Sequence, residues 1–363
     1  MTRTFVVEKR DLRRSHWLDA PAAALDAGQV RLRIDRFALT SNNITYGAFG
    51  ETMGYWKFFP TGDAATGCIP VWGFADVVES RAEGIEPGSR FYGYWPMADE
   101  AVLGPVRVNA QGFVDGAAHR RELHGIYNQY VRTTTDPLHA PGQEDLMALL
   151  RPLFMTSFLI DDFLADNGFF GATNVIVSSA SSKTSYGLGF CLEMRKTDGN
   201  LLKTMGLTSN GNVSFVRALG CFDEVVAYDD VAAMSSDSPA IYVDMSGSAS
   251  LRSLVHDHWG DRLVYSCSVG GTHWQDLGSA KGLQGPRPTL FFAPAQAKKR
   301  VTEWGAAVLQ QRLATAWHAF IDTVAAPKAP WLHVVSSRGR DAVAGTYATL
   351  LAGNVQANEG HVL

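Results

Sequence analysis

Six apolar segments in the second half of the chain, each followed by a segment with helical spacing, constrain the fold more than any other feature. Uninterrupted apolar runs are typical of parallel strands that are buried on both faces of a sheet. Strands that alternate with helices predict a doubly wound α/β sheet, and six is the strand number of the Rossmann fold. We expect these strands at residues 174–178, 201–207, 224–228, 240–244, 261–266 and 289–293.

The first part of the chain has a different pattern. Short β-rich runs separated by Gly, Pro and Asp fill residues 4–130, without a long helical pattern. From Arg151 onward apolar residues recur at helical spacing, which predicts a helix at a domain boundary. We therefore predict a β domain formed by residues 1–147 and 329–363, and a Rossmann domain formed by residues 148–328. The final section predicts a helix at 306–324, a strand at 331–337 and a helix at 342–353.

Charge and cysteine content exclude several classes of protein. The 363 residues include 32 basic and 36 acidic side chains, a net charge of −4, which provides no electrostatic surface for nucleic acid or anionic membranes. The four cysteines form no CxxC pair, so neither a disulfide scaffold nor a zinc ribbon is indicated, and a reducing, cytoplasmic setting fits. We find no apolar stretch of membrane-spanning length and no signal-peptide pattern, and we expect a soluble protein.

A serine-rich loop follows the first expected strand, where a Rossmann fold binds pyrophosphate. Glycines normally occupy this loop, because the backbone must approach the phosphates at the start of a helix. Here small residues permit that approach, hydroxyl groups donate to phosphate oxygens, and a lysine adds positive charge. Two alternatives stay open: the hydroxyls merely cap the helix, or SSKT belongs to a nucleoside triphosphatase loop without its glycines. The candidate residues are Ser179, Ala180, Ser181, Ser182, Lys183, Thr184 and Ser185.

The carboxyl edge of the predicted sheet offers further cofactor contacts. Ser209 and Asn210 follow the second strand, where NAD-binding enzymes carry an acidic residue for the ribose hydroxyl. Their uncharged side chains favour NADP(H) over NAD(H), since they do not repel a 2′-phosphate, but no basic residue adjoins them. Loops after the fourth and fifth strands reach the same edge, unless they are ordinary connections. Their candidate residues are Ser246, Gly247, Ser268, Val269 and Gly270.

These segments resemble the medium-chain dehydrogenase/reductase superfamily, in its zinc-free quinone-oxidoreductase and enoyl-reductase branch. RIDRFALTSNNITYGAFG is similar to the early segment of that superfamily, and PVWGFADVVESRAEGIEPGSRFYGY to its segment ending in GDRVxG. NVIVSSASSKTSYG occupies the place of the cofactor loop. The same loop, together with NNITYG and YWKFFP, also resembles an uncharacterised family of unknown function within the superfamily. The resemblance implies a GroES-like substrate domain and a Rossmann dinucleotide-binding domain.

Departures from the zinc enzymes of that superfamily argue against a metal. Zinc alcohol dehydrogenases have an early catalytic Cys, a GHE motif and a four-Cys lobe. Residues 40–43 and 72–74 stand in the first two places here, and the first 190 residues contain a single cysteine. We therefore expect no metal ion. His119, His124 and His139 are the alternative ligands, although HRRELH has the pattern of an ordinary polar helix.

The resemblance also places candidate catalytic residues in SNNITYG. Hydride transfer requires a nearby proton donor, and Tyr46 is the preferred candidate, with Asn43 and Thr45 beside it. Thr156 matches a position near the nicotinamide, and Tyr228 matches a tyrosine near the adenosine. Each has a structural alternative: core packing for Tyr46, a bond to the preceding helical turn for Thr156, and a buried strand end for Tyr228.

Two further patterns leave their roles open. The aromatic segment GYWKFFP, residues 54–60, covers an apolar or planar substrate, packs as a loop, or contacts a second subunit. The basic run Lys298, Lys299 and Arg300 is either solvated surface or a phosphate contact.

We expect a zinc-independent, NADPH-dependent reductase that transfers a hydride to a carbonyl, quinone or activated alkene, and that forms a homodimer. One alternative is a protein that binds a nicotinamide nucleotide without reductase activity, which the glycine-poor loop suggests. Another is a lyase or isomerase that uses the fold without net redox change. The expected partner is a small molecule, and neither nucleic acid nor a membrane.

Overall fold

The computed structural model describes residues 1–197, 199, 202–269 and 282–363. The chain forms two compact units, the first from Met1–Arg151 with Leu332–Leu363 and the second from Pro152–Trp331. Helix α2, Glu144–Asp166, passes from the first unit into the second. That these units correspond to a substrate domain and a cofactor domain stays a prediction.

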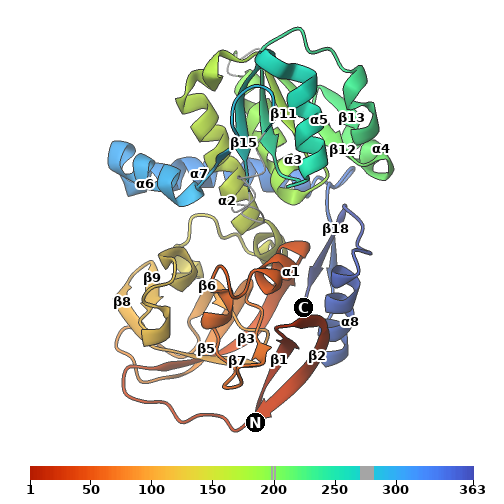
Figure 1. Cartoon of the computed structure of the whole chain (residues 1–363). Coiled ribbons are helices and arrows are strands. Elements are labelled where there is room, and N and C mark those ends of the chain that lie inside the picture. Colours follow the sequence, from red (N-terminus) through yellow and green to blue (C-terminus); the bar gives the residue numbers. More distant parts are fainter. Residues whose placement is uncertain (198, 200–201, 270–281) are drawn as a thin grey trace. The chain divides into compact units, whose positions relative to one another are not determined.

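The first unit is built on a nine-stranded sheet in which the central strands pair antiparallel (Figure 1). Its order is β17-β18-β3-β5-β6-β10-β9-β8, and β7 pairs with β3 outside this order. A smaller sheet has the order β2-β1-β4. The strands are β1 Thr2–Glu8, β2 Asp11–Ala20, β3 Val30–Leu39, β4 Thr66–Gly67, β5 Val71–Ser80, β6 Arg90–Trp95, β7 Glu100–Leu103, β8 Pro105–Asn109, β9 Gly112–Asp115, β10 Gln129–Arg132, β17 His333–Ser336 and β18 Glu359–Val362.

The end of the chain completes the first unit. Strand β18 pairs antiparallel with β3, and β17 pairs parallel with β18. Helix α8, Arg340–Leu351, contributes Tyr347 to the core, where its ring lies 5.3 Å from that of Phe5. The N-terminal strand and the C-terminal helix therefore share one apolar core. The remaining α-helix of this unit is α1, Ser41–Ala48.

The second unit contains a six-stranded sheet with the order β13-β12-β11-β14-β15-β16. Every pair is parallel, so the order 3-2-1-4-5-6 is that of a Rossmann fold and the predicted fold class is confirmed. The strands are β11 Asn174–Val177, β12 Lys203–Thr208, β13 Glu224–Ala227, β14 Ala240–Asp244, β15 Leu263–Ser268 and β16 Thr289–Leu290. The helices are α3 Lys183–Thr197, α4 Val213–Leu219, α5 Ala249–Trp259, α6 Ala293–Trp304 and α7 Ala306–Val324.

Burial on both faces explains why these strands are continuously apolar. Val175, Ile176 and Val177 of β11 have no exposed surface. Helix α5 packs its apolar residues with Ile176 and the neighbouring strands in one cluster. Helices α2, α3 and α7 meet in a second cluster, in which the Phe154 and Phe320 rings lie 4.4 Å apart.

Several element boundaries differ from the predictions by one or two residues, and the two largest differences are at the start of α2 and the end of β16. Helix α2 begins at Glu144, seven residues before the predicted start, because the acidic side chains of its first turn suit a helix N-terminus and pair with arginines of the sheet. The sixth strand ends at Leu290, and residue 293 belongs to α6, whose first turn contains a proline.

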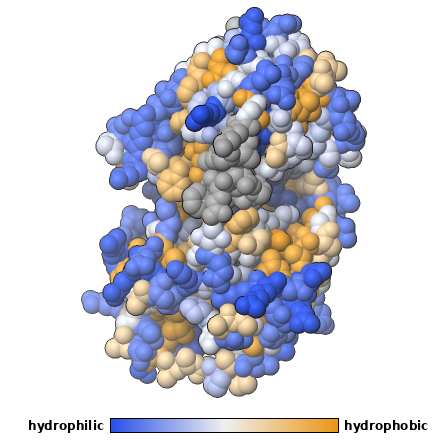
Figure 2. Space-filling model, viewed as in Figure 1, coloured by the Kyte–Doolittle hydropathy of each residue, from blue (hydrophilic) through white to orange (hydrophobic). Residues whose placement is uncertain are grey.

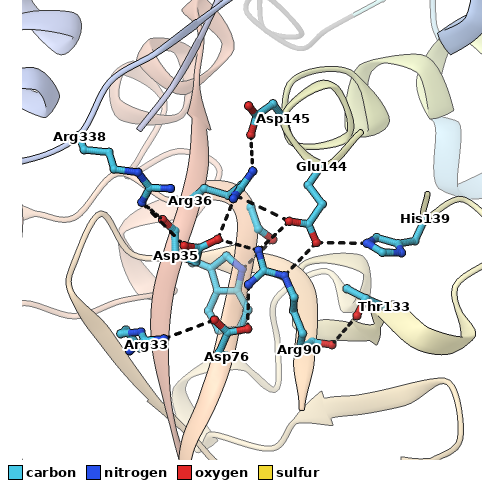
Figure 3. A network of polar contacts seen from close by, with 12 residues as sticks. Arg33, Asp35, Arg36, Asp76, Arg90, Thr133, His139, Glu144, Asp145 and Arg338 are labelled. Carbon is cyan, nitrogen blue, oxygen red and sulfur yellow. Dashed lines mark hydrogen bonds and ion pairs between the residues drawn. The ribbon is translucent and has the colours of Figure 1, made fainter. Parts of the chain in front are cut away.

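A network of ion pairs joins the start of α2 to the first-unit sheet (Figure 3). Arg90 contacts three carboxylates, those of Asp35, Asp76 and Glu144, each at 2.7 Å. Arg36 contacts Asp35 at 2.9 Å. These side chains come from β3, β5, β6 and α2, so the network fixes the position of the helix end on the sheet (Figure 3).

In the described part of the chain, no helix combines the length and apolar character needed to cross a membrane. Hydrophilic residues cover much of the face shown in Figure 2, with apolar residues in separate places between them.

Candidate functional site

A serine loop, defined as residues 178–185, connects β11 to α3 at the carboxyl edge of the second-unit sheet. Ser182 Oγ accepts a hydrogen bond from Ser185 N at 3.3 Å and so caps the helix. Ser185 Oγ in turn donates to Ser178 O at 2.9 Å. The helix-capping interpretation of these hydroxyls is therefore correct for Ser182, and the loop also has the small side chains that a phosphate approach requires.

The serine loop lies close to β12, which explains its small residues. Ala180 N donates to Leu207 O at 2.9 Å. A Cβ added to Gly206 would lie 3.0 Å from the Ala180 Cβ, so neither position has room for a larger side chain. Ser179 has a φ of +50°, a left-handed conformation that glycine adopts more easily. The backbone thus follows a glycine-like path without glycine.

Ser178 and Asp244 connect the carboxyl ends of β11 and β14. Ser178 Oγ donates to Asp244 Oδ1 at 3.2 Å and accepts from Ser246 N at 3.1 Å. Asp244, with 1% of its surface exposed, also accepts from Gly247 N at 3.0 Å and from Arg252 Nε at 2.9 Å. The predicted cofactor residues Ser246 and Gly247 are held in place by this arrangement. Ser178, Asp244 and Arg252 were not among the predicted residues, although an acid at the end of a buried strand was a signal for Asp244.

Tyr228 reaches the serine loop from the end of β13. Its hydroxyl accepts a hydrogen bond from Ser179 N at 3.2 Å. Tyr228 is partly buried and packs against the core of the second unit, so it combines core packing at the strand end with its contact to the serine loop. Ser209 and Asn210 follow β12, as predicted, and Ser209 Oγ accepts from Asn212 Nδ2 at 3.1 Å. The structure thus brings Tyr228 and the serine loop together.

The other predicted cofactor residues of the second unit have mixed outcomes. Ser268, at the end of β15, has a buried hydroxyl with no hydrogen-bond partner in the described part of the chain. Val269 N donates to Asp244 O at 2.9 Å, and Gly270 lies outside the described residues. Thr156 Oγ1 donates to Pro152 O at 3.2 Å, which is the predicted structural alternative.

Ser157, rather than Thr156, connects α2 to the serine loop. Its hydroxyl lies 2.7 Å from Thr184 O, in the first turn of α3, and 3.1 Å from Leu153 O. Lys183 and Thr184 begin that turn. The buried Ser157 was missed because a serine within an apolar helical face carries no signal for its partner.

In the first unit, SNNITYG forms helix α1 rather than a strand or loop of the sheet. Asn43 Oδ1 accepts from Thr40 N at 2.8 Å and its Nδ2 donates to Pro70 O at 2.9 Å. Asn43 therefore caps α1 and attaches it to the chain before β5, which favours a structural role. Thr45 Oγ1 donates to Ser41 O at 3.4 Å, within the same helix.

Tyr46 is buried on α1 and is surrounded by hydrogen-bond donors. Asn42 Nδ2 donates to its hydroxyl at 2.8 Å. Burial raises the pKa of Tyr46 well above its ordinary value, while the nearby Trp72, Asn42 and Tyr94 act in the opposite direction on that pKa. Trp72 Nε1 and Tyr94 OH are buried and have no hydrogen-bond partner of ordinary geometry in the described residues. Tyr46 is therefore a protonated phenol whose oxygen is surrounded by donors.

Tyr46 belongs to a tyrosine cluster that also contains Tyr55, Tyr94 and Tyr127. The Tyr46 and Tyr55 rings lie 4.5 Å apart, and the Tyr94 and Tyr127 rings 4.8 Å apart. The Tyr55 and Tyr127 hydroxyls are 3.4 Å apart, and burial raises the pKa of Tyr55 to about 12. Four phenols and the Trp72 indole thus present polar atoms within one aromatic core.

The aromatic segment GYWKFFP packs into this first-unit core, and Tyr55, Trp56 and Phe58 are buried. Of the three interpretations left open, packing as a loop is confirmed for these side chains. Arg120 Nε donates to Phe58 O at 3.0 Å and holds the segment in place.

Two predictions about polar sequence runs are wrong. HRRELH is no ordinary polar helix, because Arg120 is 2% exposed and pairs with buried Asp115 at 3.0 Å. The prediction of solvated surface for residues 298–300 is wrong for Arg300, which is buried and pairs with Asp162 at 2.7 Å, whereas Lys298 and Lys299 are exposed. In both cases a carboxylate compensates the buried charge, and for Arg300 that carboxylate lies 138 positions away in the sequence.

Comparison with known families identifies the chain. Residues 37–356 match the family described as "Protein of unknown function (DUF2855)". The chain belongs to this family. No curated protein matches the DUF2855 chain.

Solved structures show that the DUF2855 chain has the fold of medium-chain dehydrogenases/reductases. CurA in complex with NADPH, from Vibrio vulnificus, aligns with a TM-score of 0.62 and 13% identity, over 99% of this chain and 98% of that chain. The quinone oxidoreductase from Coxiella burnetii aligns with a TM-score of 0.56 and 12% identity over the same shares. The yhdH oxidoreductase from Salmonella enterica, in complex with NADP, gives 0.54 and 13%, again over 99% and 98%. The predicted resemblance is confirmed for the fold.

Among the described residues of the DUF2855 chain, no three His, Cys, Asp or Glu side chains gather as metal ligands do. All four cysteines are free and buried. His139 lies 3.1 Å from Glu144, beside the ion-pair network of Figure 3, and Phe58 O lies 3.3 Å from His119 Nε2.

Proposed function

We propose that this protein is a zinc-independent, NAD(P)H-dependent oxidoreductase that transfers a hydride to a carbonyl, quinone or activated alkene. The observation that carries the proposal is the serine loop at the carboxyl edge of a sheet with Rossmann order. In such sheets dinucleotides bind beyond the carboxyl ends of the strands, at the point where the strand order reverses. Strands β11 and β14 flank that point here.

The residues at this edge fit a dinucleotide. The first turn of α3 has backbone amides that the helix cannot satisfy internally, which suits a pyrophosphate. Because Ala180 lies close to Gly206, the side chains at this point of the serine loop are small. The buried Ser268 hydroxyl has no hydrogen-bond partner in the described part of the chain. The serine loop would hold the pyrophosphate, and Ser246, Gly247 and Ser268 would line the nicotinamide half. When bound, the nucleotide supplies the hydride.

We further propose NADP(H) in preference to NAD(H). No acidic residue occurs from Thr208 to Asn212, at the end of β12. Lys183 adds a positive charge at the serine loop. Two of the similar structures hold NADPH or NADP, which agrees with this choice.

Tyr46 is the proposed proton donor. Its phenol stays protonated at neutral pH because burial raises its pKa. After the proton leaves, donors such as the Asn42 amide stabilise the phenolate oxygen. Asn43 and Thr45 contribute by holding α1, rather than by touching substrate.

Zinc independence rests on the sequence, in which the first 190 residues contain one cysteine, Cys68. We also propose a cytoplasmic homodimer that acts on a small, apolar or planar molecule. Two alternatives remain in the same framework: a nucleotide-binding protein without reductase activity, and a lyase or isomerase. The first would bind NADPH and never oxidise it; the second would convert substrate without a change in absorbance near 340 nm.

Calorimetric titration of the purified protein with NADPH and NADH tests the proposal. We expect micromolar binding of NADPH that Lys183→Ala weakens by removing a positive charge, and that Ser182→Asp weakens by placing a carboxylate at the loop. Lys203→Ala, a change of the same type at the amino end of β12, serves as a control that leaves binding intact. If the wild type binds neither nucleotide, the oxidoreductase proposal is wrong. Binding justifies a screen of quinones, enals and enones by NADPH oxidation.

A further inference from the structure

Two consecutive residues, Tyr228 and Asp229, reach from the end of β13 to the two elements that would hold a dinucleotide. Tyr228 OH accepts from Ser179 N, in the serine loop, at 3.2 Å. Asp229 Oδ2 accepts from Asn210 Nδ2, beyond the end of β12, at 2.8 Å. The dipeptide therefore connects the serine loop with the tip of β12.

The tip of β12 is where a Rossmann fold distinguishes the two nicotinamide nucleotides. A side chain that follows the second strand contacts the adenosine ribose, whose 2′ position carries a hydroxyl in NAD(H) and a phosphate in NADP(H). Asn210 lies two residues beyond Thr208, the last residue of β12. Its side-chain amide donates a hydrogen bond to the carboxylate of Asp229, which is 19 positions away in the sequence.

The sign of the charge at this position determines its effect. A phosphate carries nearly two negative charges at neutral pH, whereas a hydroxyl carries none and donates a hydrogen bond to a carboxylate. A carboxylate beside the 2′ position therefore repels NADP(H) and tolerates or favours NAD(H). Asp229 is exposed, so water and salt reduce the repulsion without abolishing it.

We propose that Asp229, held by Asn210, is a specificity-determining residue that lowers the affinity for NADP(H) relative to NAD(H). This inference rests on the proposed function, because it concerns the same nucleotide site. If Asp229 has this role, two segments together determine which nucleotide binds: the uncharged residues at the tip of β12, and Asp229 after β13. The ratio of the affinities for NADP(H) and NAD(H) is then smaller than residues 208–212 alone indicate.

The test measures the Kd of NADPH and of NADH by calorimetry for the wild type, Asp229→Asn and Asp230→Asn. Asp229→Asn removes the charge and keeps an oxygen that accepts from Asn210, so the local structure is retained. We expect it to tighten NADPH binding about five- to tenfold and to change NADH binding by less than about twofold. The gain should shrink when the salt concentration rises.

Asp230→Asn is the matched control, because it removes the same charge from the next residue, which is also exposed. It should change the ratio of the two Kd values by less than about twofold. Asp229→Ser provides a second charge-free variant that should act like Asp229→Asn.

Three results would overturn the assignment. Equal effects of Asp229→Asn on both nucleotides, or an unchanged ratio, would show that Asp229 does not face the 2′ position. If Asp230→Asn changes the ratio of the two Kd values as much as Asp229→Asn does, the change comes from the net charge of the region rather than from Asp229 at the 2′ position. Binding of both nucleotides with an unchanged ratio would leave the proposed function standing, whereas binding of neither by any of the proteins would overturn the proposed function together with this assignment.

Discussion

Tyr46 is a phenol that burial makes a weaker acid, while nearby donors act in the opposite direction by stabilising its phenolate. Burial keeps its phenol protonated, and the Asn42 amide at 2.8 Å stabilises the oxygen when the proton has left. We predict that Tyr46→Phe lowers turnover about 10²-fold and leaves the Kd of NADPH unchanged. The measurement is NADPH oxidation with the best electrophile from the quinone, enal and enone panel, beside calorimetry. Because the pKa is raised, the wild-type rate should show no loss of this donor up to about pH 9.

Tyr347→Phe is the control for loss of a buried phenol hydroxyl. Tyr347 OH donates to Leu12 O at 2.8 Å, and its ring lies 5.3 Å from that of Phe5. Tyr347→Phe should lower the free energy of unfolding slightly without lowering turnover. If Tyr46→Phe leaves turnover unchanged, Tyr46 is not the proton donor and has the packing role that an aromatic side chain in a core usually has.

At this scale the sequence identified positions better than partners. The serine loop follows a buried strand and Tyr228 follows the third strand of the sheet, as the pattern predicted, whereas the role of Tyr46 stays a prediction. Ser178 and Asp244 escaped notice because their hydrogen bond joins residues 66 positions apart. Asn43 and Thr156 were found as polar residues in the expected segments, but their nearest acceptors are backbone carbonyls of neighbouring turns and loops. A local sequence pattern shows which residue type is present, but it does not show which group that residue hydrogen-bonds.

At the scale of elements, the segment GYWKFFP is a packing unit. Trp56 lies against two glycines, and a Cβ added to Gly67 would be 2.4 Å from its ring. We predict that Gly67→Ala destabilises the first unit by about 1–3 kcal/mol, because the indole must shift within a filled core. Urea unfolding followed by tryptophan fluorescence measures this change.

Gly345→Ala, in helix α8 of the same unit, is a control with the opposite expected sign. No atom lies within 4 Å of the added Cβ, so the substitution should stabilise by about 0.5–1 kcal/mol through helix propensity. If Gly67→Ala has no effect on stability, Trp56 is not held in a packed core, and the segment regains its alternative role of covering a substrate.

Elements with a regular apolar pattern were the easiest to predict. Strand β14 has the predicted bounds, Ala240–Asp244, and helix α7 spans Ala306–Val324 as expected. The start of α2 and the end of β16 were displaced, because ion pairs and a proline-containing first turn set them rather than apolar periodicity. Helix α1 was unforeseen, because its short amphipathic stretch lies between β-rich segments.

For the whole molecule, segment order predicted the fold without a strong motif. A β-rich start, a central set of six parallel strands and a C-terminal return are compatible with few topologies. The strand order of the six-stranded parallel sheet agrees with that expectation. Solved structures with 13% identity or less share this fold, so packing and connectivity are retained where side chains have diverged. The substrate depends on those side chains and does not follow from the fold.

The ion-pair network of Figure 3 should make the stability of the first unit depend on pH. Hydrogen bonds and attraction from Arg90 hold the pKa values of Asp35 and Glu144 below their ordinary range, against the effect of burial. A lowered folded-state pKa means that the contribution is complete above the unfolded value, near pH 4, and is lost as pH falls through the folded value.

We predict that Arg90→Gln destabilises the protein by about 1–3 kcal/mol at pH 7, where the half-buried pairs are intact. The difference between wild type and variant should stay constant from about pH 7 to pH 6 and shrink toward about pH 3, as the carboxylates become protonated. Urea unfolding across this range measures it, with Lys203→Gln, which removes the exposed pair with Glu224, as the control. Asp161, whose pKa burial raises, contributes with the opposite sign in both proteins and cancels from the difference. A difference that does not change with pH would show that Arg90 acts through packing on Phe74, where its guanidinium lies 5.3 Å from the ring, rather than through charge.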